Sequence, residues 1–197
     1  ITEYKKTEES LKETEAKFKL ITENSIDEIW VRDLNLNLLY VSPSCIKVHG
    51  YTQDEFVNIP LKEILTPESF YYVTHILKEE LDFDSNPHAE RTRSRTVLIK
   101  ERHKNGNIIW TENQVSFIRD ENNKPKAIIG VTRDVTEKIK SDQIREAVYR
   151  ISEATHTSEN LENLFKEIHQ IIATIMPAKN FYIALYDKNS DLISFPY

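Results

Sequence analysis

Five segments of the chain contain hydrophobic runs and are separated by turn signals or by helical patterns, in which hydrophobic residues follow spacings of three and four. The five segments are rich in β-branched and aromatic residues. The longest two flank Asn105-Gly106, a dipeptide that suits the positive φ angles of a hairpin turn. The pattern predicts an antiparallel sheet of at least five strands, at residues 26–33, 36–42, 96–104, 107–118 and 127–135.

Helix signals lie between the second and third predicted strands. Ser42 precedes a proline and is predicted to cap a short helix, and Thr52 with Glu55 forms the pattern of a capping box. Thr66 also precedes a proline and begins a longer amphipathic segment. We therefore expect two short helices and one longer helix after the second strand.

Apolar residues occupy both phases of the two longest predicted strands. The residues on the two phases are Val97, Ile99 and Trp110, against Leu98, Val115 and Phe117. Because successive side chains of a strand point to opposite faces, this pattern predicts that both faces of the sheet are covered.

The first 21 residues contain no Gly or Pro, and Tyr4, Leu11 and Phe18 are spaced seven apart. This spacing is typical of a coiled-coil seam, although an amphipathic helix lying on its own domain fits it equally well. A helical pattern also follows the last strand, where Asp134 is placed to cap a helix and Glu137 lies three residues later. We interpret both segments as helical connectors through which the chain forms a homodimer.

Another helix is expected after Ser158 as its cap, followed by a strand at residues 181–186. Residues 1–6 resemble residues 135–140, which indicates that a similar domain precedes residue 1. Since the chain starts without Met and stops in a predicted strand, we expect a longer parent protein.

The composition narrows the class of protein. With 39% hydrophobic and 29% charged residues, the chain of 197 residues is an ordinary globular protein. Its net charge of -6 argues against a nucleic-acid surface, which needs clustered Lys and Arg. No apolar run approaches the roughly 20 residues that cross a bilayer, and the single cysteine excludes an intrachain disulfide. We expect a cytoplasmic protein with no nucleic-acid partner and no direct membrane insertion.

Patterns typical of catalysis are absent from the sequence. It has only three glycines, no phosphate-binding glycine loop and no nucleophile elbow. No histidine is followed by Glu, so the phosphoacceptor helix of a histidine kinase is missing, and we expect no activity in this chain. We predict no metal site and interpret the following histidines as surface residues: His49, His88, His103, His156 and His169.

Several segments together resemble the PAS family in their order and spacing. They are residues 27–33, 40–44, 50–52, 103–106 with Trp110, and 134–137, of which the last belongs to a PAC-type segment. The resemblance covers residues 18–140. It implies an α+β fold with a five-stranded antiparallel sheet, short helices inserted after strand two, and connector helices at both ends.

Residues 141–197 are similar to the first helices and first strand of a GAF domain. We therefore expect a helical connector at 1–20, a PAS domain at 21–137, a second connector at 138–157, and an incomplete GAF domain at 158–197. Tandem PAS and GAF modules joined by helices resemble two-component sensor histidine kinases. This implies a sensory and relay segment, with GAF and kinase domains downstream in a phosphorelay protein. The alternatives are a ligand-free PAS dimerisation scaffold and a parent with a different output domain.

A PAS resemblance also implies a small cavity on one face of the sheet, where a small molecule could bind. For the first strand, the family's phase turns Trp30 and Arg32 inward, whereas hydrophobicity alone would turn Ile29 and Val31 inward. An inward Arg32 would favour an anionic ligand, but a surface Arg32 paired with an acidic neighbour is the simpler expectation. The candidate pocket residues are Trp30, Arg32, Thr111, Asn113, Val115 and Thr132.

The identity of any cofactor stays open. The flavin-binding branch of the family carries its reactive cysteine in an Asn-Cys-Arg context that this chain lacks, and we expect Cys45 to be a small buried residue. The haem-binding branch uses a histidine of the long helix, and His75 is the residue that a haem-based gas sensor would use. We expect His75 to be partly exposed or hydrogen-bonded, so neither flavin nor haem is favoured.

Signal transfer is expected where the last strand passes into the exit helix. The residues that we expect to couple the two are Asp134, Thr136 and Glu137.

Overall fold

The computed structural model describes residues 2–86, 88, 90–158 and 160–197, with side chains from residue 8 onward. Residue 1, which belongs to the predicted terminal repeat, lies outside the described part. The side chain of Tyr4, which begins the predicted seven-residue spacing, also lies outside it. The chain forms two compact units, of which the first ends at Thr136 and the second begins at Glu137.

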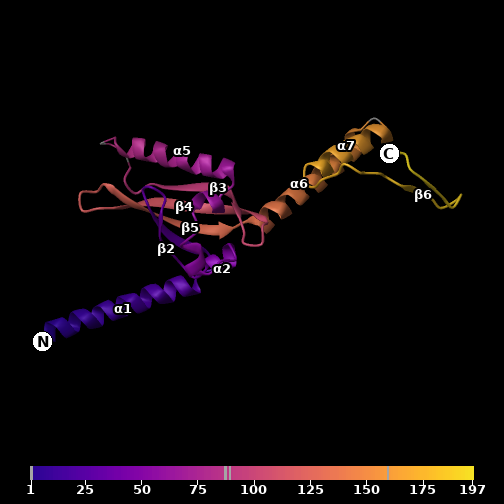
Figure 1. The fold of residues 1–197 in the computed structure, drawn as a ribbon. Helices are drawn as coiled ribbons and strands as arrows, with labels where there is room; N and C mark the ends of the chain where they lie inside the picture. The colour runs from indigo at the N-terminus through magenta and orange to yellow at the C-terminus, as the bar shows by residue number, and fades with distance from the viewer. Residues whose placement is uncertain (1, 87, 89, 159) are drawn as a thin grey trace. The chain divides into compact units, whose positions relative to one another are not determined.

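The first unit is built on an antiparallel sheet (Figure 1). The strand order is β2-β1-β5-β4-β3, which confirms the predicted α+β fold with five strands. Strand β3 lies at one edge and β2 at the other. The strands are β1 (Glu28–Asp33), β2 (Leu38–Val41), β3 (Ser94–Arg102), β4 (Ile108–Arg119) and β5 (Pro125–Asp134).

The predicted hairpin at Asn105-Gly106 joins β3 to β4. The N–H of Gly106 donates to the carbonyl of His103 at 2.9 Å, and the N–H of His103 donates to the carbonyl of Asn107 at 2.9 Å. Only Gly106 of the pair has a positive φ, at 88°. The turn therefore uses glycine's freedom at one position and leaves Asn105 in an ordinary conformation.

Four helices follow the first hairpin: α2 (Cys45–Val48), α3 (Gln53–Phe56), α4 (Leu61–Ile64) and α5 (Pro67–Asp84). The capping box of Thr52 and Glu55 is present at α3, and the Thr66 side chain accepts the N–H of Ser69 at the start of α5. Both predicted caps are confirmed. The sequence pattern missed α4, which follows Pro60.

The predicted cap at Ser42 is wrong. Its hydroxyl instead accepts the backbone N–H of Ile29 at 2.9 Å, which ties the end of β2 to β1. Helix α2 begins after Ser44, whose side chain makes no capping hydrogen bond. Ser42 therefore joins the end of β2 to β1 and does not cap a helix.

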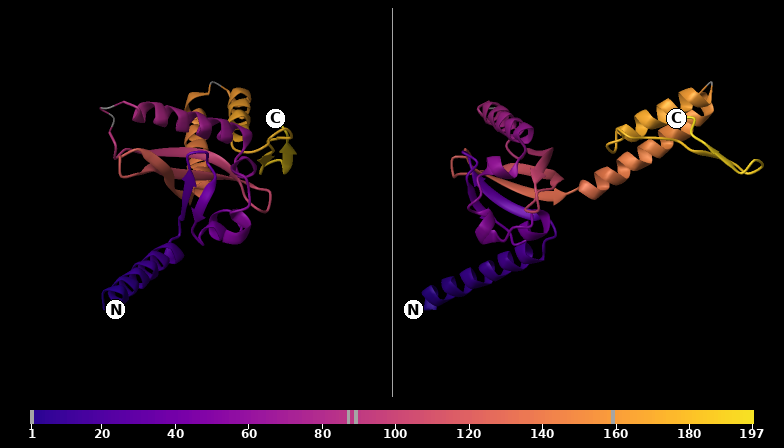
Figure 2. Two further views of the ribbon diagram at one scale, coloured as in Figure 1. Left: turned by 60° about the vertical axis from the view of Figure 1, so that its left-hand side comes forward. Right: turned by 45° about the vertical axis from the view of Figure 1, so that its right-hand side comes forward.

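The prediction that both sheet faces are covered is also wrong. Helix α5 lies alongside β3 (Figures 1 and 2), and the buried cluster of Val41, Cys45, Phe56 and Ile64 forms on the inner face. The register pairs Arg95 with Val115, which gives Val115 the same face as Val97. On the opposite face, Leu98 is 48% exposed and Ile108 is 46% exposed.

Helix α1 (Thr2–Asn24) precedes the sheet. Ion pairs one turn apart, such as Lys12 with Glu8, support it, and the Phe18 ring lies 5.4 Å from the Tyr40 ring of β2. In the seven-residue row, Leu11 is exposed, whereas Phe18 is half-exposed and contacts Tyr40. The pairing of this row with a second chain stays a prediction.

Helix α6 (Thr136–Thr157) starts at the end of the first unit. The second unit also contains α7 (Leu161–Ala173) and a two-stranded sheet of β6 (Leu185–Asp187) and β7 (Leu192–Ser194). Asn160, not Ser158, caps α7 by accepting the N–H of Asn163. Strand β6 begins four residues later than predicted. In the described part of the chain, no helix has the length and apolar character needed to cross a bilayer.

Candidate functional site

A cavity of ≈ 100 Å³ lies between the inner face of the sheet and the helices that cover it. Five of the six predicted pocket residues line it, whereas the fully buried Thr111 lies behind the lining. Trp30 and Arg32 both face this cavity, as the family's phase implies and as hydrophobicity alone does not. Its walls are mostly apolar and include Phe56, Leu65, Val73, Ile76, Leu77, Val97, Ile99, Val115, Phe117 and Ile128.

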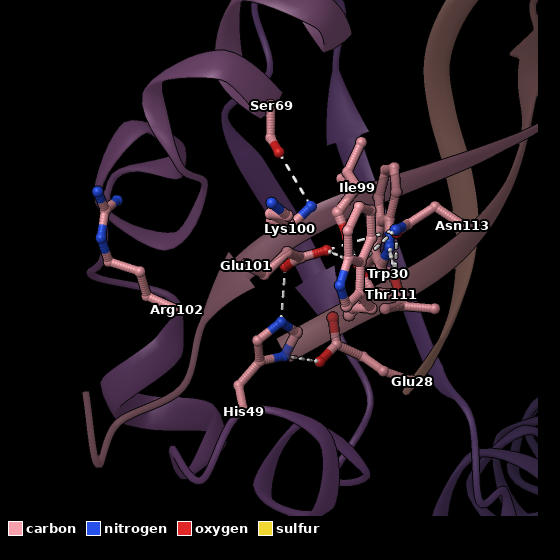
Figure 3. Close-up of polar contacts among 12 residues, drawn as sticks. Glu28, Trp30, His49, Ser69, Ile99, Lys100, Glu101, Arg102, Thr111 and Asn113 are labelled. Atoms are coloured by element: carbon pink, nitrogen blue, oxygen red, sulfur yellow. Dashed lines mark hydrogen bonds and ion pairs between the residues drawn. The ribbon is translucent and has the colours of Figure 1, made fainter. Parts of the chain in front are cut away.

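Two glutamates of the cavity lining, Glu28 and Glu101, form a buried charged cluster with His49 (Figure 3). The ring nitrogens of His49 lie 2.8 Å from a carboxylate oxygen of Glu28 and 2.7 Å from one of Glu101. His49 is 1% exposed and the two glutamates are 2% and 5% exposed. Both nitrogens of an imidazole can donate to carboxylates only when both carry protons, so this geometry favours an imidazolium at His49 between two carboxylates.

The pKa values of these groups follow from their contacts. Burial disfavours the charged imidazole, but the hydrogen bonds that its ring donates to Glu101 and Glu28 outweigh burial and raise the pKa of His49 to about 10. For Glu101, burial opposes ionisation, yet the partners His49, Thr111 and Asn113 hold its pKa below the ordinary value. At neutral pH His49 and Glu101 are therefore both ionised.

A chain of neutral polar groups extends the cluster across the sheet. Glu101 accepts from the Thr111 hydroxyl at 2.6 Å and from the Asn113 amide at 3.3 Å. The Thr132 hydroxyl donates to the Asn113 carbonyl oxygen, and the Trp30 indole donates to Thr132 at 2.8 Å. The Asn113 amide also donates to Thr111 at 3.0 Å, so both of its contacts as a donor lie on the Glu101 side.

Arg32 corrects the expectation of a surface residue, because it is 6% exposed. Its guanidinium donates to the carbonyl of Leu36 at 2.9 Å and lies 5.6 Å from the centre of the Trp30 ring. Burial lowers the pKa of Arg32, and the nearby charges of Glu101 and Glu28 oppose that shift. Arg32 was expected to pair with an acidic neighbour at the surface. Its acidic neighbours Glu28 and Glu101 are instead buried inside the protein.

Sequence reasoning missed the charged cluster. His49 was predicted at the surface, and that prediction is wrong because α2 turns the ring inward between β1 and β3. Two signals were present: Glu28 shares the strand phase of Trp30, and Glu101 shares the phase of Ile99. A glutamate on the buried phase of a strand requires a partner, and this requirement points to a buried cation.

The two residues weighed for cofactor chemistry lie away from the cavity. His75 is exposed on α5, where its ring stacks on Tyr71 and lies 3.4 Å from Glu79. Cys45 is fully buried, as predicted; its thiol donates to the Tyr51 carbonyl, and burial raises its pKa to about 11. Among the described residues, no group of His, Cys, Asp and Glu side chains could hold a metal ion.

The predicted coupling residues lie at the junction of β5 and α6. The Asp134 carboxylate accepts the N–H of Thr136 at 2.8 Å, and the Thr136 hydroxyl accepts the N–H of Trp110 at 2.8 Å. The N–H of Val135 donates to the Trp110 carbonyl at 2.9 Å. The Glu137 side chain is exposed and pairs with Lys140. Thus the backbone N–H and the backbone carbonyl of Trp110 on β4 both bond to the start of the exit helix.

The same β4 residue connects to α5 through β3. Trp110 pairs with Lys100, whose ammonium group lies 4.8 Å from the centre of the indole ring. The N–H of Lys100 donates to the Ser69 hydroxyl at 2.9 Å, and its carbonyl accepts the N–H of Thr66 at 3.2 Å. Figure 3 shows the first of these bonds. Contacts therefore run without a gap from α5, which covers the cavity, to α6.

Comparison with known proteins places the chain in a family. A family model described as PAS fold matches residues 16–135, which is more than half of the chain. The chain belongs to the PAS family. It is 24% identical over 175 residues to the sensor histidine kinase TmoS of Ectopseudomonas mendocina, an alignment that covers 87% of this chain and 17% of TmoS. The chain thus spans less than a fifth of that relative.

Solved structures agree with the family assignment. The PAS domain of a protein from Colwellia psychrerythraea is 21% identical with a TM-score of 0.53, covering 64% of this chain and 98% of that one. The PAS domain of an HTR-like protein from Haloarcula marismortui is 20% identical with a TM-score of 0.52, covering 66% of this chain and 98% of that one. At these identities the likeness establishes the fold.

Proposed function

We propose that this chain is a sensory and signal-relay segment of a two-component sensor histidine kinase. In this proposal, a small molecule in the PAS cavity biases the sheet and α5, and the junction at Asp134 and Thr136 passes that bias to α6. The observation that carries the proposal is the continuous set of contacts through Ser69, Lys100 and Trp110. A ligand can shift such an equilibrium only through its different affinity for the two states.

Two further observations support the same assignment. The cavity retains open space, which favours a ligand-binding role over a scaffold whose interior is filled by side chains. The likeness to TmoS extends over 87% of this chain, beyond the PAS match alone. We propose that residues 158–197 begin a GAF domain, that a kinase domain follows, and that the connectors pair in a cytoplasmic homodimer.

The coupling residues provide the test of this function. The chain is fused ahead of the catalytic core of a sensor histidine kinase, and autophosphorylation is measured for wild type, Asp134→Ala and Thr136→Val. Both substitutions loosen the start of α6, so we expect autophosphorylation to change by at least about fivefold, the lower range of allosteric coupling. The melting temperature of each variant shows whether the fold is retained.

The matched control is Asp142→Asn on the same helix, where the carboxylate pairs only with Arg145 at the surface. This control should leave autophosphorylation unchanged. If Asp134→Ala and Thr136→Val also leave it unchanged while the fusion is active, the relay proposal is wrong.

A further inference from the structure

Glu28 has one carboxylate oxygen that no group in the described part of the chain satisfies. Its Oε2 binds His49, while Oε1 receives no hydrogen bond from the described residues (Figure 3). Among the described residues, every side-chain oxygen that has no accessible surface makes a hydrogen bond. An oxygen without a partner, such as Oε1 of Glu28, therefore borders open space. Since Glu28 is 2% exposed and lines the cavity, the open space beside Oε1 is the cavity itself. An unsatisfied buried acceptor calls for a hydrogen-bond donor, which ordered water or a bound ligand can supply.

The charges around the cavity already balance. Among the buried residues, Glu28 and Glu101 contribute two negative charges, and His49 and Arg32 contribute two positive charges. The other charged residues of the lining, Arg93, Arg95 and Glu80, form ion pairs with one another, and Arg95 also pairs with Glu79. An anionic or cationic ligand would leave one uncompensated charge in a region of low dielectric constant, which is costly. The buried Arg32 therefore does not require an anion, and the balance favours an uncharged ligand.

The neighbouring amide is already engaged by other residues. Asn113 donates to Glu101 and Thr111 and accepts from Thr132. The other walls are mostly apolar side chains of the sheet and of α5, and the charged residues among them, Glu80, Arg93 and Arg95, are paired. A ligand that fits this lining has an apolar body and presents a donor at the Glu28 end.

We propose that the cavity binds a small uncharged molecule with an apolar body and a hydroxyl group, which donates its hydrogen to Oε1 of Glu28. This inference rests on the proposed function only in taking the cavity as the sensory site. It specifies the ligand class, whereas the fusion experiment tests the relay without any ligand.

The test compares four cyclohexane derivatives of similar size with the full chain. Dissociation constants are measured by NMR titration for cyclohexanol, fluorocyclohexane, cyclohexanecarboxylate and the cyclohexylammonium ion. A hydrogen bond to a charged acceptor contributes about 1.5–3 kcal/mol. We therefore expect cyclohexanol to bind at least about tenfold more tightly than each of the other three.

Two variants locate the donor site. Glu28→Gln should reduce the preference for cyclohexanol over fluorocyclohexane to less than about threefold, because the acceptor loses its charge. Glu80→Gln changes a carboxylate elsewhere in the cavity lining and should preserve the preference. If Glu28→Gln does not fold, the four-compound series on the wild-type chain still decides the question.

Each remaining outcome has one meaning. Equal binding of cyclohexanol and fluorocyclohexane would overturn the donor at Glu28, and tightest binding of the carboxylate would overturn the uncharged ligand. Failure of all four compounds to bind the folded chain would also overturn this ligand class. The relay proposal is tested separately, by the autophosphorylation of the Asp134 and Thr136 variants.

Discussion

Replacing His49 with Ala is expected to lower the free energy of unfolding by about 3–5 kcal/mol, the range for removing one partner of a buried ion pair. The substitution leaves the carboxylates of Glu28 and Glu101 facing each other with no cation between them. It also removes the contact of the His49 ring with Phe56, whose centres lie 4.9 Å apart. Urea denaturation followed by circular dichroism measures the change.

The control for this substitution is His88→Ala, because His88 is exposed. Its effect should stay within about 0.5 kcal/mol of wild type, as for most surface substitutions. A loss of less than about 1 kcal/mol for His49→Ala would contradict the ionised cluster, since an uncompensated buried charge costs more than that.

Stability is expected to fall as the pH rises from about 6.5 to about 10, the ordinary and folded-state pKa values of His49. Between these values the folded protein keeps the His49 proton and the unfolded chain has released it. The contribution of His49 is therefore complete below pH 6.5 and is lost as the pH approaches 10. The slope from one proton is about 1.4 kcal/mol per pH unit. Urea denaturation at pH 6, 7, 8 and 9 measures it.

Glu101 acts in the opposite direction at low pH. Its pKa is lowered in the folded state, so its contribution to stability is present above the ordinary value of 4.5 and is lost as the pH falls through the folded value.

Nitrogen NMR of the His49 ring gives an independent test, in which both ring nitrogens should carry protons at pH 8. A neutral imidazole at that pH, or stability that does not decrease between pH 7 and 9, would show that the cluster is not ionised.

The sheet could be predicted from the sequence because its signals are local. The turn at Gly106 and the caps at Thr52 and Thr66 depend on residues a few positions apart, and the structure has them as expected. Ser42 carried the same local signal and failed as a cap, because a long-range partner, the N–H of Ile29, competed for its hydroxyl. Local signals are reliable only where no such competitor is near.

The cavity was predicted less completely than the sheet. One residue of register decides which face a strand side chain occupies, so hydrophobicity alone would have turned Ile29 inward instead of Trp30. The family's phase resolved this choice for Trp30 and Arg32. His49 could not be found in the same way, because its partners are 21 and 52 residues away in the sequence and no local pattern links them.

We propose a coupling of α5 to the exit helix through β3 and β4. Amide NMR spectra of the chain test it directly when Ser69→Ala is compared with Thr74→Ala, a substitution on the same helix whose hydroxyl bonds only within α5. Ser69→Ala removes the hydrogen bond to Lys100, so we expect the amide signals of Trp110, Val135 and Thr136 to shift, whereas Thr74→Ala leaves them in place. Shifts that end at Lys100 in the Ser69 variant would contradict the claim.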